Sequence, residues 1–184
     1  MAELTFAQVD ELLKYDPKTG KLFWKPRTPD MFNEGKRFSR EHACAKWNTR
    51  YAGEEALTAI NNGGFFGTVY AKSYLAHRIA WLLYYGEWPT HEIDHINGVR
   101  ADNRIENLRD VTHRINLRNQ KRKSTNKTGF SGISKTRAGD KWCVRVRVDG
   151  SKKTIGTFAT LEDAISARQA ADKEHGYHPN HGRD

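Results

Sequence analysis

The stretch EIDHINGVRADNRIENLRDVTHRIN (residues 92–116) places two short strand patterns, a Gly- and Asn-rich loop and a helix start in direct succession. EIDH predicts a first strand, INGVRADN a turn-rich loop, NLRDVT a second strand, and HRINLRNQ a helix that Thr112 caps. Neighbours on an ideal strand point to opposite faces, so Asp94 and His95 share one cleft only at a strand end. The order strand, loop, strand, helix therefore predicts a polar site at the end of a hairpin.

Four side chains of this stretch suit hydrolysis of a phosphodiester. Such a reaction needs an activated water and a hard cation that neutralises charge on the transition state. His95 is the candidate general base, because histidine accepts a proton near neutral pH. Asp94 and Asn116 offer oxygen atoms of the kind that Mg2+ prefers. Asn107, in the connecting segment, is expected to hydrogen-bond the backbone and fix the shape of the loop.

The same residues resemble the motif of HNH endonucleases, in the His-Asn-Asn variant of phage homing enzymes. The resemblance covers about residues 77–119 and includes the lead-in YLAHRIAWLLYYGEWP. The intervals of 12 residues from His95 to Asn107 and 9 to Asn116 are those of the family pattern. The resemblance implies that His95 is the general base, that Asp94 and Asn116 are metal ligands, and that Asn107 orients the base.

The resemblance also implies one divalent metal ion per active site, with Mg2+ expected first and Mn2+ or another divalent ion as the alternative. Many family members have His where Asn116 stands, which leaves the identity of the metal open. It further implies a phage-encoded protein in a bacterial host. A structural reading stays open, in which DHINGVRADN is a surface loop and Asn107 a turn residue.

Five further histidines are interpreted mainly as structural. His77 lies ahead of an apolar run on a predicted helix and is expected to pack or to contact phosphate. His113 is expected to begin the next helix, and a contact with phosphate or a role as an alternative ligand is the other interpretation. His175, His178 and His181 recur at regular spacing, but Gly176 and Pro179 argue against one helical face, so we expect a solvated tail.

A basic segment follows the motif. No acid occurs from Val111 to Gly139, although this segment is rich in Lys and Arg. Such a run favours contact with negative charge, and a solvated tether is the alternative. The DNA contacts predicted in and beside this segment are Arg114, Arg118, Asn119, Lys121, Arg122, Lys123, Lys127, Lys135 and Arg137.

Beyond the basic segment, GISKTR, KWCVRVRVDG and KKTIGTF predict three strands, and LEDAISARQAADKEHG predicts a helix capped by Thr160. Alternation along the middle strand puts the valines on the face that the helix covers and leaves Arg145 and Arg147 on the open face. Lys135, Arg137, Lys152 and Lys153 are expected to join them there. Such a face can enter a major groove, and the alternative is a stabilising sheet with solvated arginines.

This module is similar to the plant ethylene-response-factor (ERF) DNA-binding domain over residues 129–176, most closely in the GI start, KW, IGTF and the ED-A helix. The similarity implies a DNA-binding mode. Ser134 and Thr136 stand where the plant domains tend to have Arg, and Thr154 where they often have Trp. The plant sequence preference therefore does not carry over.

Composition narrows the class of protein. The chain has 184 residues and a net charge of +9, which suits one or two small domains that associate with polyanions. No segment approaches the roughly 18 apolar residues of a membrane span, and the N-terminus is acidic, so we expect a cytoplasmic protein away from the membrane. Cys44 and Cys143 form no CxxC pair, so neither a disulfide framework nor structural zinc is expected.

The sequence thus predicts an α+β fold, with a ββα-metal nuclease domain followed by a three-stranded antiparallel sheet packed on one helix. Near the N-terminus, LTFAQVDELLKYD predicts a helix and KLFWK a strand, residues 26–64 show no period, and a helix is expected over residues 74–86. The predicted division lists residues 1–72 as an N-terminal region on the core or on DNA, 73–120 as the nuclease core, 121–128 as a basic linker, 129–178 as the DNA-binding module and 179–184 as a tail.

The leading hypothesis is a homing-type endonuclease that acts on double-stranded DNA. One active site per chain predicts nicking by a monomer, while double-strand cleavage requires a dimer or two sequential cuts. A DNA-binding regulator with a degenerate HNH scaffold is the second hypothesis. An enzyme acting on RNA is the third, because a basic sheet alone does not distinguish the two polymers.

Overall fold

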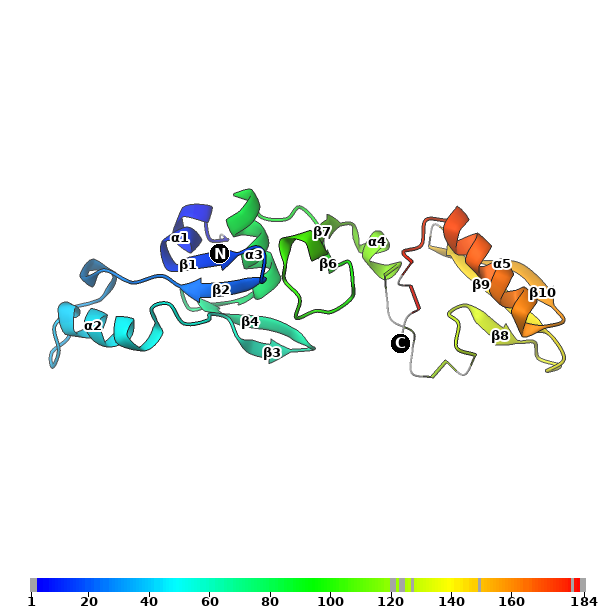
Figure 1. Cartoon of the computed structure of the whole chain (residues 1–184), viewed down its shortest axis with the longest axis horizontal. Helices are drawn as coiled ribbons and strands as arrows, with labels where there is room; N and C mark the ends of the chain where they lie inside the picture. Colours follow the sequence, from blue (N-terminus) through cyan, green and yellow to red (C-terminus); the bar gives the residue numbers. More distant parts are fainter. Residues whose placement is uncertain are drawn as a thin grey trace. The chain divides into compact units, whose positions relative to one another are not determined.

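The structure, a computed structural model, describes residues 3–119, 122, 125–126, 128–148, 150–179 and 181–182. The predicted DNA contacts Lys121, Lys123 and Lys127 lie outside these described residues. The chain divides into two compact units, Met1–Val111 and Thr112–Asp184 (Figure 1). Both combine helices with small sheets, which confirms the predicted α+β class. The division falls within residues 73–120, and the five-part division stays a prediction.

The first unit begins with helix α1 (Phe6–Leu12) and a hairpin of β1 (Leu13–Asp16) and β2 (Lys21–Trp24). The hydroxyl of Thr5 accepts the backbone N–H of Gln8, and the Gln8 side chain accepts the backbone N–H of Thr5, so a capping box starts the helix. The sequence predicted a helix over LTFAQVDELLKYD (residues 4–16), which is wrong for Leu13–Asp16, the residues of β1. Leu13 adopts an extended conformation and pairs with Trp24 instead.

Residues 26–64 contain structure that the sequence did not predict. A short turn, η1 (Pro29–Met31), precedes helix α2 (Arg40–Tyr51), and Ser39 accepts the backbone N–H of His42 at the start of α2. The expectation of irregular chain over these residues is therefore wrong. The helix escaped prediction because Cys44 is its single buried residue, so no apolar period marks it.

A second sheet of the first unit has the antiparallel order β3 (Ala59–Asn61), β4 (Gly64–Val69) and β5 (Lys72–Leu75). Helix α3 (Ala76–Tyr85) follows and ends at Gly86, whose φ of 82° is left-handed. This helix confirms the prediction over residues 74–86 to within two residues. Its apolar face packs with α1 and the first hairpin in the main core, which includes Val9, Leu13, Val69, Ile79 and Leu82.

The predicted hairpin of the motif is present in the first unit. Strands β6 (Glu92–His95) and β7 (Leu108–Val111) pair antiparallel, with Asp94 opposite Arg109 and His95 opposite Leu108. A single turn, η2 (Ile105–Asn107), leads into β7. Ala80 of α3 packs with Ile93 and Leu108, so the hairpin rests on the helix that precedes it.

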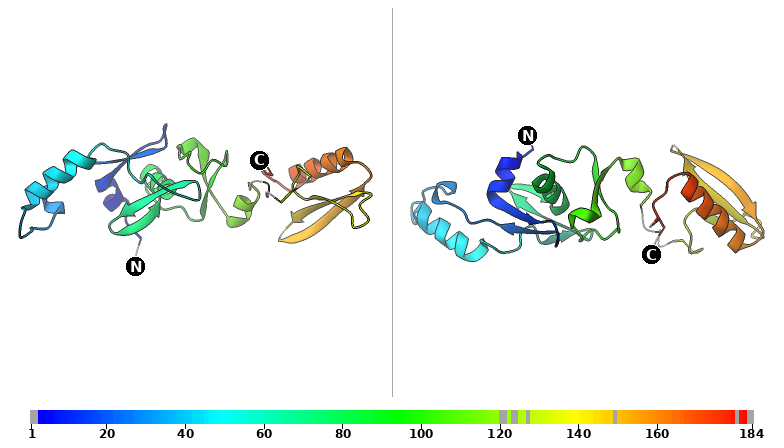
Figure 2. Two further views of the ribbon diagram at one scale, coloured as in Figure 1. Left: turned by 90° about the horizontal axis from the view of Figure 1, so that it is seen from below. Right: turned by 45° about the horizontal axis from the view of Figure 1, so that its top comes forward.

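The second unit contains α4 (His113–Leu117), β8 (Ile133–Lys135), β9 (Trp142–Val148), β10 (Ser151–Phe158) and α5 (Leu161–Glu174). The strands form an antiparallel sheet in the order β10-β9-β8, and α5 covers one face of it, as the sequence predicted (Figure 2). Thr160 caps α5 by accepting the backbone N–H of Asp163, as predicted. Thr112 precedes α4 without a side-chain cap, so that prediction is wrong.

Candidate active site

Asp94 and His95 lie at the end of a strand, as the sequence predicted. Strand β6 ends at His95, and the chain turns at once: the backbone N–H of Gly98 donates to the carbonyl of His95 at 2.7 Å. The backbone N–H of Ile96 donates to the carbonyl of Asn107 at 2.9 Å and closes the base of the loop. Both Asp94 and His95 are 6% exposed, so the polar pair is buried beside the bend.

Asn103 contacts the imidazole of His95 directly. Nε2 of His95 lies 3.0 Å from Oδ1 of Asn103, and Asn103 is itself buried. An amide oxygen accepts hydrogen bonds and does not donate them, so this contact places the proton of a neutral His95 on Nε2. Nδ1 of His95 then carries the lone pair.

Burial keeps His95 in its neutral form. Removal from water lowers the pKa of His95, while the hydrogen bond to Asn103 acts in the opposite direction with smaller effect. His77 of α3 packs edge-on against the His95 ring, with ring centroids 5.1 Å apart. Burial lowers the pKa of His77 to about 3, so His77 stays neutral as well. A neutral imidazole is the form required of a general base.

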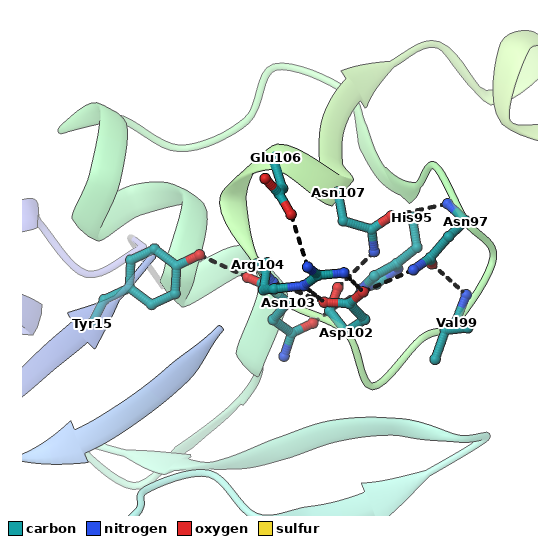
Figure 3. Close-up of polar contacts among 9 residues, drawn as sticks. All are labelled: Tyr15, His95, Asn97, Val99, Asp102, Asn103, Arg104, Glu106 and Asn107. Atoms are coloured by element: carbon teal, nitrogen blue, oxygen red, sulfur yellow. Dashed lines mark hydrogen bonds and ion pairs between the residues drawn. The ribbon is translucent and has the colours of Figure 1, made fainter. Parts of the chain in front are cut away.

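Asn107 braces the loop between β6 and β7, and Figure 3 shows its two hydrogen bonds across that loop. Its Oδ1 accepts the backbone N–H of Asn97 at 2.9 Å, and its Nδ2 donates to the carbonyl of Asp102 at 2.7 Å. Asn97 in turn donates from Nδ2 to the carboxylate of Asp102 at 2.7 Å. These contacts agree with the expected backbone bonding of Asn107, whereas its catalytic role stays a prediction.

An ion pair reinforces the same loop. Arg104 donates from Nη2 and Nε to the two carboxylate oxygens of Asp102, each at 2.8 Å. The hydrogen bond from Arg104 is the largest influence on the Asp102 carboxyl and lowers its pKa to about 2. Asp102 therefore stays ionised at neutral pH and keeps its bonds to Arg104 and Asn97.

The N-terminal hairpin supports the loop from outside the motif. The hydroxyl of Tyr15 donates to the carbonyl of Asn103 at 2.7 Å (Figure 3). The backbone N–H of Ile105 donates to the carbonyl of Pro17 at 3.1 Å. Gly20 adopts a φ of +76°, and a Cβ at this position would lie 2.5 Å from the backbone nitrogen of Arg104. The turn between β1 and β2 thus lies directly against the residues that follow Asp102.

Asp94 is paired across the hairpin. Arg109, its partner in β7, donates from Nη2 at 2.6 Å and from Nε at 2.9 Å to the same oxygen of Asp94, Oδ2. Arg109 and Asn103 were not predicted as site residues. Both lie within the motif, but their partners depend on the strand register and on the bend after His95.

The oxygen donors predicted for a metal ion are of the class that a hard divalent cation prefers. Asp94 supplies a carboxylate oxygen, and the amide oxygen of Asn116 is of the same class. Asn116 lies in α4 of the second unit, so its pairing with Asp94 stays a prediction. Among the described residues, no three His, Cys, Asp or Glu side chains are grouped to hold a metal ion.

The strand register in the second unit shows which predicted DNA contacts lie on the open face of the sheet. Lys152 lies opposite the exposed Arg147 and shares its face. Lys153 lies opposite Val146, and Lys135 lies opposite Trp142 with Nζ 5.1 Å from the indole ring. Because cross-strand partners share a face, the placement of Lys135 and Lys153 on the open face is wrong.

The other predicted contacts differ in exposure. Arg114, Arg137 and Arg145 are exposed, whereas Asn119 is buried. Arg118 lies 5.3 Å from the Tyr177 ring. Arg122 donates from Nη1 to the carbonyl of Gly129 at 2.6 Å. The exposed arginines are thus better placed than Asn119 for direct contact with DNA.

Comparison with known proteins bears on the hairpin and its flanking helices. In the described part of the chain, no helix is long and apolar enough to cross a membrane. No curated protein and no solved structure matched the chain. Residues 74–118, from the start of α3 to the end of α4, match the family model described as HNH endonuclease. This match, on the residues that form the site, supports a nuclease of the HNH family.

Proposed function

We propose that this chain is a metal-dependent DNA endonuclease of the homing type, which hydrolyses one phosphodiester bond per active site. The observation that carries the proposal is the buried, neutral His95, held by Asn103 at the strand end next to Asp94. This pair lies inside the segment that matches the HNH endonuclease family. The match supports DNA as the substrate.

His95 activates the attacking water in the proposed reaction. The imidazole accepts a proton as the water oxygen bonds to phosphorus. The bond from phosphorus to the leaving sugar oxygen breaks, and that oxygen takes a proton from solvent water. Asn103 keeps the ring in the required tautomer. General-base assistance of this kind contributes roughly 100- to 10,000-fold.

Asp94 and Asn116 would hold one divalent ion, Mg2+ first and Mn2+ as the alternative. The ion, when bound, would neutralise charge that develops on the phosphate and the leaving oxygen. Arg109 holds one oxygen of Asp94, Oδ2, by two hydrogen bonds.

The second unit is proposed to select the cleavage site. Its similarity to the ERF domain and the exposed face with Arg145, Arg147 and Lys152 support DNA binding by the sheet. Arginine and lysine on such a face can contact guanine edges or phosphates. We also propose that a monomer cuts one strand of the duplex and leaves a nick.

Plasmid nicking in Mg2+ or Mn2+ tests the proposal. His95→Ala is expected to reduce the nicking rate by at least about 100-fold, because the general base is lost. His175→Ala is the matched control, since it removes a histidine that follows α5 in the second unit. Nicking by His95→Ala at the wild-type rate would remove the mechanism. DNA binding by the wild type without cleavage in any divalent ion would favour the regulator hypothesis.

A further inference from the structure

Helix α2 is poorly buried for its length. It has 12 residues, of which Cys44 alone is buried. In Figures 1 and 2 it lies at one end of the first unit, and the β6–β7 hairpin lies on the other side of α3. A helix of this length is marginal in water on its own. The contacts that hold α2 therefore define which of its faces is structural.

One stripe of α2 is anchored to Arg27. Asn48 accepts the backbone N–H of Arg27 at 2.8 Å and donates to its carbonyl at 2.9 Å. The Trp47 ring lies 3.9 Å from the Arg27 guanidinium, and Sγ of Cys44 donates to the Arg27 carbonyl at 3.1 Å. Cys44, Trp47 and Asn48 have the i, i+3, i+4 spacing of one helical face. This face is the structural one.

The opposite stripe carries hydrogen-bond donors and positive charge. His42, Lys46 and Arg50 follow it at helical spacing, and all three are exposed. Thr49 lies on the same stripe, but its hydroxyl donates to the carbonyl of Ala45 at 2.9 Å. The Arg50 guanidinium lies 5.2 Å from the Tyr51 ring, which supports it at the end of the helix.

The segment before α2 extends this surface. Phe38 is 50% exposed and stacks on His42, with ring centroids 4.7 Å apart, and Arg37 lies 5.3 Å from the Phe38 ring. Residues 36–38 therefore continue the outward stripe beyond the helix start with further basic and aromatic side chains.

Carboxylates are kept away from the outward stripe. Residues 32–51, all of them described, contain two acids, Glu34 and Glu41. Glu34 pairs with Arg40 at 3.3 Å. Glu41 falls in the helical row of Cys44 and Asn48, on the anchored side. The stripe therefore presents Lys, Arg and His side chains to a partner, and residues 32–51 add no carboxylate to it.

We propose that the outward stripe of α2 binds the phosphate backbone of the DNA, so that the first unit holds the duplex through contacts of its own. The inference rests on the proposed function for its ligand, DNA. Lys, Arg and Thr side chains are the usual donors to phosphate oxygens. A helix of 12 residues is about 18 Å long, roughly the length of five base pairs. The stripe therefore fits several successive phosphates of one strand.

The test measures the salt dependence of duplex binding by the full chain in EDTA, which removes divalent ions and prevents cleavage. Lys46→Ala/Arg50→Ala is expected to reduce the slope of log K against log salt by about 1.8, from about 0.9 per phosphate contact. Affinity at low salt falls by about tenfold or more. Alanine is the best helix former, so these changes keep α2 folded, which circular dichroism checks.

Lys14→Ala/Lys18→Ala is the matched control, because it removes two exposed charges from the first hairpin of the same unit. Lys46→Arg/Arg50→Lys keeps the charges of α2 and is expected to keep the wild-type slope. An unchanged slope in Lys46→Ala/Arg50→Ala, or an equal loss in the control, would overturn the inference. Nicking by Lys46→Ala/Arg50→Ala at the wild-type rate, once DNA saturates it, would show that the change affects binding and not the chemical step. If the wild type does not nick DNA, that result counts against the proposed function alone.

Discussion

The loop between β6 and β7 and helix α2 are both rich in polar residues, yet the structure uses that polarity in opposite ways. In the loop, Asn103 and Asn107 are buried and bonded to the imidazole or to the backbone. In α2, Lys46 and Arg50 face solvent, and Asn48 alone makes two bonds to the chain beneath it. Buried polarity fixes a geometry, whereas exposed polarity remains available to a ligand.

Among changes to the loop and to α2, removal of the Asn103 side chain, which contacts His95, should have the largest effect on the nicking rate. Asn103→Ala is expected to lower the nicking rate by about 10- to 100-fold, because the imidazole loses its tautomer and its position. Asn103→Asp keeps an acceptor beside Nε2 and adds a negative charge that raises the pKa of His95. The acid limb of the pH–rate profile should therefore move to higher pH in this variant. An acid limb that does not shift would contradict the contact between Asn103 and His95.

Removal of the loop brace should mainly affect stability. Asn107→Ala leaves the N–H of Asn97 and the carbonyl of Asp102 without their present partner. Buried groups without a partner cost about 1–3 kcal/mol each, so unfolding in urea should show a loss of about 2 kcal/mol or more. Asn97→Ala removes a bond to the Asp102 carboxylate and the bond accepted from the N–H of the exposed Val99, and it is the milder comparison because water can replace the second bond. Equal stability of Asn107→Ala and wild type would show that the loop does not depend on Asn107.

Acid should destabilise the packing around His77. Its pKa is about 3 in the folded chain and about 6.5 in the unfolded chain, so the unfolded state binds the proton first. The contribution of the neutral His77 to the free energy of unfolding is constant above pH 6.5. It is lost as the pH falls from 6.5 towards 3, by about 1.4 kcal/mol per pH unit. His77→Gln should flatten this part of the stability profile. A slope equal to that of the wild type would contradict the buried neutral form.

The smallest change in stability is expected in α2. Lys46→Ala/Arg50→Ala removes two exposed side chains and should alter the free energy of unfolding by less than about 0.5 kcal/mol. The same urea titration measures this value beside Asn107→Ala. A loss of several kcal/mol would mean that the outward stripe is structural after all, and the contrast between loop and helix would fail.

The sequence predicted what depends on local pattern. The strand ending at His95, the cap at Thr160 and the alternation around Arg145 all follow from spacing along one segment. Helix α2 was missed because its anchored stripe mixes Cys44, Trp47 and Asn48, and its partner, Arg27, lies in another segment.

The strand register was the second feature that the sequence did not predict. The position of Lys135 and Lys153 on the sheet depends on pairing across turns, and adjacent residues such as Lys152 and Lys153 cannot share one face. The contacts of Asn103 and Arg109 likewise arise between segments that only the folded chain brings together. The metal-ligand pairing of Asp94 with Asn116 and the roles of the DNA contacts stay predictions.

The close approach at Gly20 sets a limit on the modularity of this nuclease. The segment that matches the HNH endonuclease family, residues 74–118, contains His95 and its loop but not the turn that lies against Asn103 and Arg104. Tyr15 and Pro17 contribute hydrogen bonds to the same loop from the N-terminal hairpin. Excised or transplanted without that hairpin, the matched segment would lose the outer support of the loop between β6 and β7. Recombination that exchanges the motif between proteins would accordingly have to carry the N-terminal turn along with it.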